Sequence, residues 1–128
     1  MAILPSDEQM AALVKKDPGC PIKMLNLLKF KEFAEYPDGS EADLSGKEAY
    51  LRYGAKVAEL VGNLGGKFLF GSDANTLVIG EGELQWDMVV IVQYPSVAAF
   101  IEMTDSSEYD EIHVHRDAGL AHQLLVQC

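Results

Sequence analysis

Arg116 is the residue whose surroundings in the sequence most clearly suggest a chemical role. Residues 68–128 contain ten of the 20 acidic residues of the chain but only one of its 10 Lys and Arg residues, Arg116. A guanidinium in such a segment either pairs with a neighbouring acid or binds an anionic ligand through its planar fork of N–H donors. The pairing alternative offers Asp87, Glu108 or Asp117 as partners. The binding alternative makes Arg116 a clamp for a substrate carboxylate or enolate.

His113 is a candidate proton carrier. Helical spacing places it on the same face as Tyr109, Ile112 and Arg116, because residues three, four and seven apart lie along one side of a helix. Imidazole is the commonest general base near neutral pH. The alternative is a structural histidine with a satisfied hydrogen bond. His115 is predicted to point to another side of the helix.

His122 is the second candidate proton carrier. It alternates with Leu124 and Val126 in a final segment with strand character, while Asn26 is the polar residue of an otherwise apolar early segment. If these two strands are neighbours, His122 lies beside Asn26. Two polar groups on apolar strand faces need each other, water or a ligand. Asn26 is therefore a candidate ligand-orienting residue.

Four aromatic residues complete the set of candidate ligand-binding residues: Tyr50, Tyr53, Trp86 and Tyr109. Three of them, Tyr50, Tyr53 and Trp86, could line an aromatic pocket. The alternative is that they belong to the core, since aromatic residues at helical or alternating spacing usually pack inside a protein.

The sequence predicts neither a metal nor a bound cofactor. His113 and His115 are two residues apart on a predicted helix and point about 200° away from each other, so they cannot share one ion. Glu111 and His115 have the spacing of an exposed i, i+4 pair. Phosphate-loop, dinucleotide-binding and nucleophile-elbow motifs are absent from the sequence, so covalent catalysis has no visible support.

The 128 residues that must position these groups fit one domain. Residues 1–21 are predicted to be a helical extension, because Ser6 and Gln9 have the spacing of a capping box and a helix follows over about 6–16. The core is residues 22–128. Within it, segments 22–31 and 86–94 are apolar on both alternating faces, which predicts central strands covered on both sides.

The remaining elements follow from caps and periodicity. A second capping box at Ser45 and Glu48 opens the strongest helix, which Gly65 and Gly66 end. Residues 67–71 are predicted to be a strand, and 75–81 either continue it past a bulge or form a separate hairpin arm. A helix after Ser96 restarts near 105–107, with Gly119 as its C′ residue, and the last strand covers 120–126.

The predicted order after the first helix is β-α-β-β-α-β, the pattern of a ferredoxin-like α+β fold with an antiparallel four-stranded sheet. Two helices can cover only one face of such a sheet. Since two strands are apolar on both faces, the second face needs another cover. The simplest cover is the same face of a second copy, which predicts a homodimer.

Charge and targeting signals restrict the partners and the location. A formal net charge of −10 argues against nucleic acid and anionic membranes as partners. The first ten residues contain no basic region typical of a signal peptide, and no apolar run approaches the length of a membrane span. We therefore expect a cytoplasmic protein in which Cys20 and Cys128 are free thiols.

Five short motifs resemble one family in their order along residues 22–128. They are Asn26-Leu27-Leu28-Lys29-Phe30, Gly65-Gly66-Lys67-Phe68, Trp86-Asp87 leading to Tyr94-Pro95-Ser96, Phe100 with Met103 and Tyr109, and Arg116-Asp117-Ala118-Gly119-Leu120. Together they are similar to the DUF1330 family of the dimeric α/β-barrel superfamily. The resemblance implies a ferredoxin-like fold and a dimer. That family has no established reaction, and the superfamily includes cofactor-free monooxygenases, haem-binding enzymes and small isomerases whose ligands often lie between sheet and helices.

The sequence leaves three functional hypotheses. The first is a cofactor-independent dimeric enzyme for a small organic acid or aromatic molecule, with Arg116 as anion clamp, His113 or His122 as proton carrier, and Asn26 or Tyr53 orienting the ligand. The second is a non-catalytic ligand-binding or stress-type protein that uses the same pocket. The third is a haem-binding protein. Fold analogy cannot choose among them.

Overall fold

The computed structural model describes residues 2–128, which form four helices and one sheet. The elements in chain order are α1 (Asp7–Lys15), β1 (Ile22–Phe30), α2 (Gly46–Asn63), β2 (Lys67–Asp73), β3 (Met88–Tyr94), α3 (Val97–Thr104), α4 (Ser107–Gly119) and β4 (Leu120–Gln127). After α1 the chain has the predicted ferredoxin-like order, with α3 and α4 together in the place of the second helix. The α+β fold class is confirmed.

The sheet has the strand order β2-β3-β1-β4, and all its neighbouring strands are antiparallel. The two central strands, β1 and β3, are the two segments whose alternating positions are apolar on both faces. Asn26 lies in the middle of the sheet, opposite Val90 on one side and Leu125 on the other. The strand pattern therefore correctly predicted that these two strands are central.

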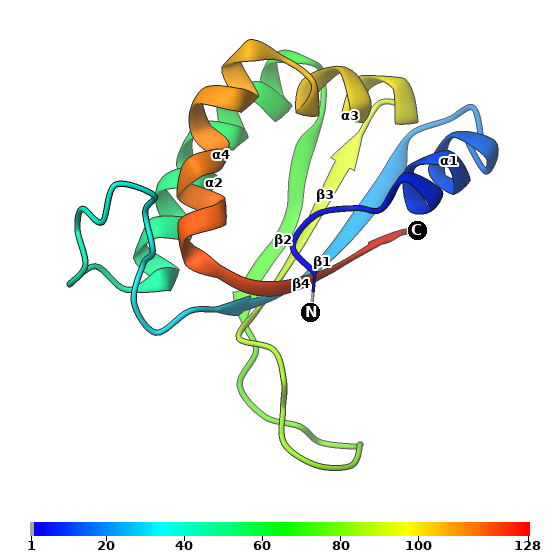
Figure 1. Ribbon diagram of the computed structural model, residues 1–128. Helices are drawn as coiled ribbons and strands as arrows, with labels where there is room; N and C mark the ends of the chain where they lie inside the picture. Colours follow the sequence, from blue (N-terminus) through cyan, green and yellow to red (C-terminus); the bar gives the residue numbers. More distant parts are fainter. Residues whose placement is uncertain (1) are drawn as a thin grey trace.

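One face of the sheet packs against the helices and holds the core. Figure 1 shows α2 and α4 side by side over this face, with α3 beyond one end of α4. The four largest fully buried side chains come from both layers: Ile22, Leu28, Leu120 and Val61. Each such side chain stabilises the fold by about 1.5–3 kcal/mol through burial.

Serine side chains cap the helices as the sequence predicts. Ser6 and Gln9 form a complete capping box at the start of α1. Ser45 accepts a hydrogen bond from the Glu48 N–H at the start of α2, which is the serine half of the second predicted box. The N-terminal ends of α3 and α4 are capped by Ser96 and Ser106 in the same way.

Gly119 has a different role from the predicted one. It is the last residue of α4 rather than a C′ residue beyond the helix end. A Cβ atom at Gly119 would lie 2.2 Å from the carbonyl oxygen of Gly46, and a Cβ at Gly46 would lie 2.1 Å from the carbonyl oxygen of Lys31. Both glycines are therefore required by the close approach of α2, α4 and the end of β1.

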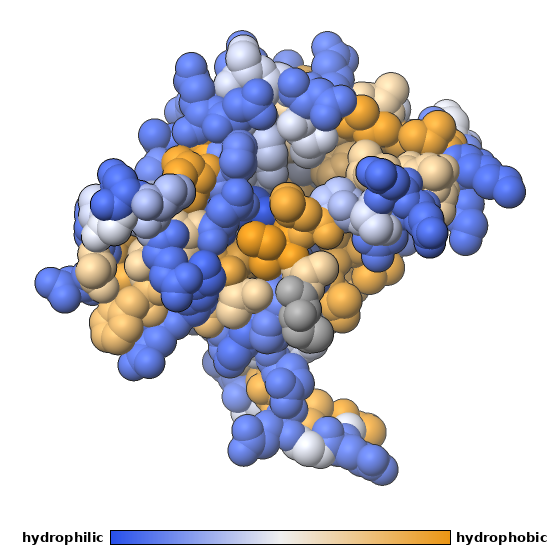
Figure 2. All heavy atoms as spheres, in the orientation of Figure 1, coloured by the Kyte–Doolittle hydropathy of each residue, from blue (hydrophilic) through white to orange (hydrophobic). Residues whose placement is uncertain are grey.

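The segment between β2 and β3 forms neither of the two predicted strands. Strand β2 contains a register shift between Phe68 and Phe70 and ends at Asp73. Residues 74–87 then form a loop that extends away from the body of the protein (Figure 1). At its tip Val78 and Ile79 are 86% and 92% exposed, and Figure 2 shows apolar atoms along the loop. The apolar run that predicted a strand is thus a surface feature.

The other face of the sheet carries no layer from α2, α3 or α4, and its side chains are mostly apolar. The cross-strand pairs place seven of them together: Leu25, Leu27, Phe70, Val89, Ile91, Leu124 and Val126. We call this set the open face. Phe70, Leu124 and Val126 are each about half exposed.

Two further findings concern the chain as a whole. No helix within residues 2–128 is long and apolar enough to cross a membrane. Cys20 and Cys128 are exposed free thiols, as predicted.

Candidate functional site

A cavity of about 810 Å³ lies on the helix-bearing face, and it brings together most of the predicted site residues. Its walls come from the N-terminal segment and α1, from β1, β3 and β4, and from α2, α3 and α4. Five predicted residues line it: Asn26, Tyr53, Tyr109, His113 and Arg116. We call this space the large cavity.

Arg116 is buried at the edge of the large cavity and is held by three partners. Its guanidinium donates to Asp117 Oδ1 at 2.9 Å, to Gln123 Oε1 at 2.7 Å and to the backbone carbonyl of Ile3. Only 9% of the residue is exposed. Of the two alternatives for Arg116, the structure thus contains the ion pair, with Asp117 as the acid.

His113 is the second partner of Asp117. Its Nδ1 lies 2.9 Å from Asp117 Oδ2, so the carboxylate joins the imidazole and the Arg116 guanidinium through separate oxygens. Because a carboxylate accepts hydrogen bonds, the contact assigns the proton of the neutral ring to Nδ1. Within residues 2–128 no hydrogen bond reaches Nε2, and the His113 side chain is 42% exposed. Nε2 is therefore the ring nitrogen available to a ligand.

The same polar chain continues into the sheet. Gln123 Nε2 donates to Asn26 Oδ1 at 2.7 Å, and Asn26 Nδ2 donates to the carbonyl oxygen of Val90 at 3.2 Å. Hydrogen bonds thus connect His113 on α4 through Asp117 to Arg116, and then through Gln123 to Asn26 at the centre of the sheet. A network with satisfied members fixes the orientation of its side chains.

Two tyrosines lie next to His113. The hydroxyls of Tyr53 and Tyr109 are 3.1 Å apart, and the Tyr109 ring stacks on the His113 ring at a centroid distance of 6.2 Å. Burial, followed by the neighbouring Tyr109 and Tyr50, holds the pKa of Tyr53 well above its ordinary value. The Tyr53 phenol therefore keeps its proton at neutral pH and can donate a hydrogen bond.

The rest of the lining defines the kind of molecule that fits. Apolar side chains cover much of it, among them Leu13, Met24, Tyr94, Phe100, Met103 and Leu125. The charged lining residues are two cations, Lys16 and Arg116, and three acids, Asp105, Asp110 and Asp117. Since Arg116 is already paired, the lining has no excess of positive charge for an anion.

His122 and Trp86 lie on the opposite side of the sheet, which corrects the prediction that His122 is beside Asn26. His122 pairs in register with Lys29, and a register shift precedes it at the start of β4. The residue after it, Gln123, takes the place beside Asn26. The Trp86 ring packs edge to face on His122 at 5.4 Å, and His122 Nε2 is buried without a partner among the described residues.

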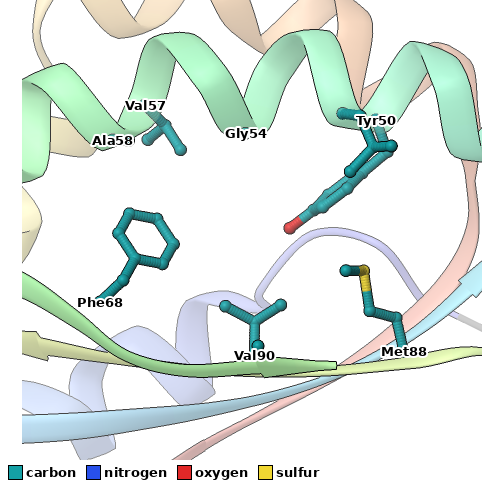
Figure 3. Close-up of a pocket in the computed structure, with 9 residues that line it drawn as sticks. Tyr50, Gly54, Val57, Ala58, Phe68, Met88 and Val90 are labelled. Carbon is teal, nitrogen blue, oxygen red and sulfur yellow. The ribbon is translucent and has the colours of Figure 1, made fainter. Parts of the chain in front are cut away.

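Tyr50 lines a different space, a cleft of about 270 Å³ between α2 and strands β2 and β3. Figure 3 shows its hydroxyl pointing into this cleft, across from Phe68 and Val90. The aromatic residues predicted as one pocket are therefore divided among three places: the large cavity, this cleft and the open face.

Sequence reasoning missed two parts of the site. Gln123 carried no signal of its own, because a polar residue in a terminal strand is common. Asp117 was considered only as a partner of Arg116, although its i, i+4 spacing from His113 was visible. Among residues 2–128 no group of three His, Cys, Asp or Glu side chains could hold a metal ion.

The fold and the position of the large cavity place the protein among ferredoxin-like α+β proteins. The chain belongs to the DUF1330 family, described as a domain of unknown function, whose model matches residues 40–127. No protein of curated function matches the chain.

Three solved structures are similar to this one. The methylated RPA0582 protein has a TM-score of 0.90 and 38% sequence identity, over 99% of this chain and 93% of that chain. RPA0582 from Rhodopseudomonas palustris, described as of unknown function, has a TM-score of 0.87 and 36% identity, over 98% and 94%. A candidate antibiotic biosynthesis monooxygenase from Caulobacter crescentus CB15 has a TM-score of 0.52 and 14% identity, over 85% and 88%, which shows a shared fold alone.

Proposed function

We propose that this protein is a small cofactor-independent enzyme that transfers a proton within a neutral organic molecule bound in the large cavity. The observation that supports it is the chain of contacts from Arg116 through Asp117 to His113, which ends at a ring nitrogen without a partner in the described chain. An imidazole oriented by a carboxylate is a suitable general base.

The chemistry requires no group beyond these side chains. A C–H bond next to a carbonyl breaks, its proton moves to His113 Nε2, and the electron pair remains on the substrate as an enolate. Asp117 stabilises the imidazolium that forms. The Tyr109 and Tyr53 hydroxyls share one hydrogen bond, so one of their two protons lies between them and the other can be donated to the developing oxyanion. The imidazolium then returns the proton to a different atom, which gives an isomer of the substrate.

Arg116 acts in this proposal as a positioning residue. Its guanidinium holds Asp117, Gln123 and the Ile3 carbonyl, so most of its donor capacity is already used. We therefore favour a neutral substrate over the small organic acid that an Arg116 clamp would bind. An aromatic or alicyclic carbonyl compound suits the many apolar side chains of the lining.

We also propose that the working form is a homodimer joined through the open face. Its seven apolar side chains come from all four strands, and three of them, Phe70, Leu124 and Val126, are about half exposed. Large exposed apolar patches usually mark an interface. Packing the same face of a second copy against it would shield these side chains from water.

The function is tested by isotope exchange. Native mass spectrometry of the purified protein identifies any retained molecule, and that molecule, together with a panel of neutral hydroxyketones and cyclic diketones, is incubated in D₂O with the wild type and His113→Gln. We expect the wild type to incorporate deuterium next to the carbonyl, and the variant to be slower by about 10²-fold or more.

Each alternative gives a different result. A retained molecule that never exchanges or changes would contradict the enzyme and favour a ligand-binding protein. Absorbance near the Soret region would favour the haem-binding hypothesis. Exchange that is equal in the wild type and in His113→Gln would remove His113 from the mechanism.

A further inference from the structure

The cleft beside Tyr50 is separate from the large cavity, since the two spaces share no lining residue. Residues from α2, β2 and β3 line it: Tyr50, Leu51, Gly54, Val57, Ala58, Phe68, Gly71, Met88 and Val90. The Tyr50 hydroxyl is the only side-chain oxygen or nitrogen in this set. The cleft is therefore an apolar space with one polar group.

That polar group is aimed into the cleft and has no partner in the described chain. Tyr50 is only 8% exposed, and its ring is fixed by Phe30 and Tyr53 at centroid distances of 5.4 and 5.3 Å. Its hydroxyl points into the space between α2 and the sheet (Figure 3). Burial raises the pKa of Tyr50 to about 12, so the phenol is a neutral donor at physiological pH. His122 Nε2 is the buried side-chain atom left without a partner in the described chain, so the Tyr50 oxygen reaches solvent through the cleft, where the acceptor of a ligand can replace water.

Two glycines keep the cleft open. Gly54 lies in the middle of α2 and Gly71 lies within β2. Neither has a positive φ, and a Cβ atom at either position would meet no atom within 4 Å. Glycine weakens both helix and strand interiors. Backbone geometry and packing therefore do not require these glycines, and each leaves open the part of the cleft that a side chain there would fill.

We propose that the cleft is a second binding site, for a small neutral aromatic ketone or aldehyde whose carbonyl oxygen accepts the Tyr50 hydrogen bond. The volume of about 270 Å³ suits one ring with a short substituent, since a cavity of roughly 150 Å³ holds benzene. Phe68 and Met88 offer a ring and a sulfur atom to the aromatic face. The neutral lining excludes ions.

The test uses a matched pair of probes, acetophenone and ethylbenzene, which have similar shapes but differ in the carbonyl. Both are titrated into the full-length protein, and NMR follows the Gly54 and Gly71 amides and the Met88 methyl group. We expect acetophenone to bind about fivefold more tightly than ethylbenzene. In Tyr50→Phe the two probes should bind equally, because the ring stays and the donor is lost.

The second part of the test uses substitutions that fill the cleft with a side chain. Gly54→Leu should weaken both probes at least tenfold, and Gly54→Ala by a smaller factor while preserving the fold. Gly62→Ala is the matched control, because Gly62 is also in α2, has open space around it and does not line the cleft. His113→Gln should leave probe binding unchanged, so this site can fail or succeed independently of the proposed catalysis.

Three outcomes would overturn the proposal. One is the absence of shifts at Gly54 and Gly71 with either probe. Another is an acetophenone preference that survives in Tyr50→Phe. The third is probe binding that appears only when Val78 and Ile79 are both changed to Asp, which would assign the cleft to the apolar loop of a second copy.

Discussion

The adjacent residues His122 and Gln123 point to opposite faces of the sheet, and they differ in whether their polar atoms have hydrogen-bond partners. Gln123 joins Arg116 to Asn26 on the helix-bearing face, where each of these polar side chains has a partner. His122 points to the other face, where its Nε2 is buried and unpaired within the described chain. The hydrogen-bond network of the large cavity thus lies on one face, and we propose that the open face packs against another apolar surface.

Removing Arg116 should have the largest effect on stability among these predictions, because Arg116 has three partners in the hydrogen-bond network of the helix-bearing face. Arg116→Ala leaves Asp117, Gln123 and a backbone carbonyl without their donor, so we expect it to lower the free energy of unfolding by about 3 kcal/mol. Arg116→Lys keeps the charge but loses the fork, and should cost less. Urea denaturation measures both. Equal stability of Arg116→Ala and the wild type would show that the network contributes little to the fold.

A charge on the open face should separate the proposed dimer. Ile91→Asp places a carboxylate among apolar side chains, and we expect the dimer dissociation constant to rise by about 100-fold, the effect of roughly 2.7 kcal/mol. Sedimentation velocity measures the two species. A surface substitution away from the face, Lys56→Glu, serves as the control. A wild-type monomer at micromolar concentration would refute the dimer itself.

The adjacent pair at positions 122 and 123 allows a direct comparison of the faces. Gln123→Leu should destabilise the protein by about 1–3 kcal/mol, because it leaves Asn26 and Arg116 with unsatisfied groups. His122→Phe keeps a ring against Trp86 and removes the orphaned nitrogen, so it should be neutral or stabilising by about 1 kcal/mol. Thermal and chemical unfolding give both values. A reversal of this order would contradict the contrast between the faces.

Replacing His115 should give the smallest of these effects, a change in how the free energy of unfolding depends on pH. Partial burial, helped by Lys56 and Arg52, holds the pKa of His115 below its ordinary value of 6.5. The unfolded chain therefore takes up the proton more readily. The neutral His115 side chain therefore contributes to stability above about pH 6.5. This contribution is lost as the pH falls toward the lower pKa that His115 has in the folded protein. Unfolding of His115→Gln, measured from pH 7 to 5, should show a shallower slope than the wild type.

Much of the fold could be predicted because it depends on patterns that are local in the sequence. The serine caps and the two strands that are apolar on both faces each carry their signal within ten residues. Gly119 and segment 75–81 could not be assigned in this way. Gly119 is required by the approach of another helix, and the apolar run at 75–81 has no surface to pack against within the described chain.

The site was only partly predictable for a related reason. Helical spacing correctly grouped Tyr109, His113 and Arg116 on one face of α4, where they line the large cavity. His122 was misplaced because one irregularity at the start of β4 decides which strand residues face the helices. A shift of one residue moves every side chain to the other face. Periodicity alone cannot locate such a shift, and it cannot reveal Gln123.

The most direct test of the account compares solvent-deuterium exchange by the wild type, His113→Gln and Asp117→Asn, with any retained molecule and the neutral carbonyl panel. We expect exchange by the wild type, a loss of about 10²-fold or more in His113→Gln, and a substantial loss in Asp117→Asn with the substrate still bound. Deuterium incorporation that neither substitution slows would contradict the proposed proton transfer. A bound molecule into which the wild type incorporates no deuterium would contradict it as well.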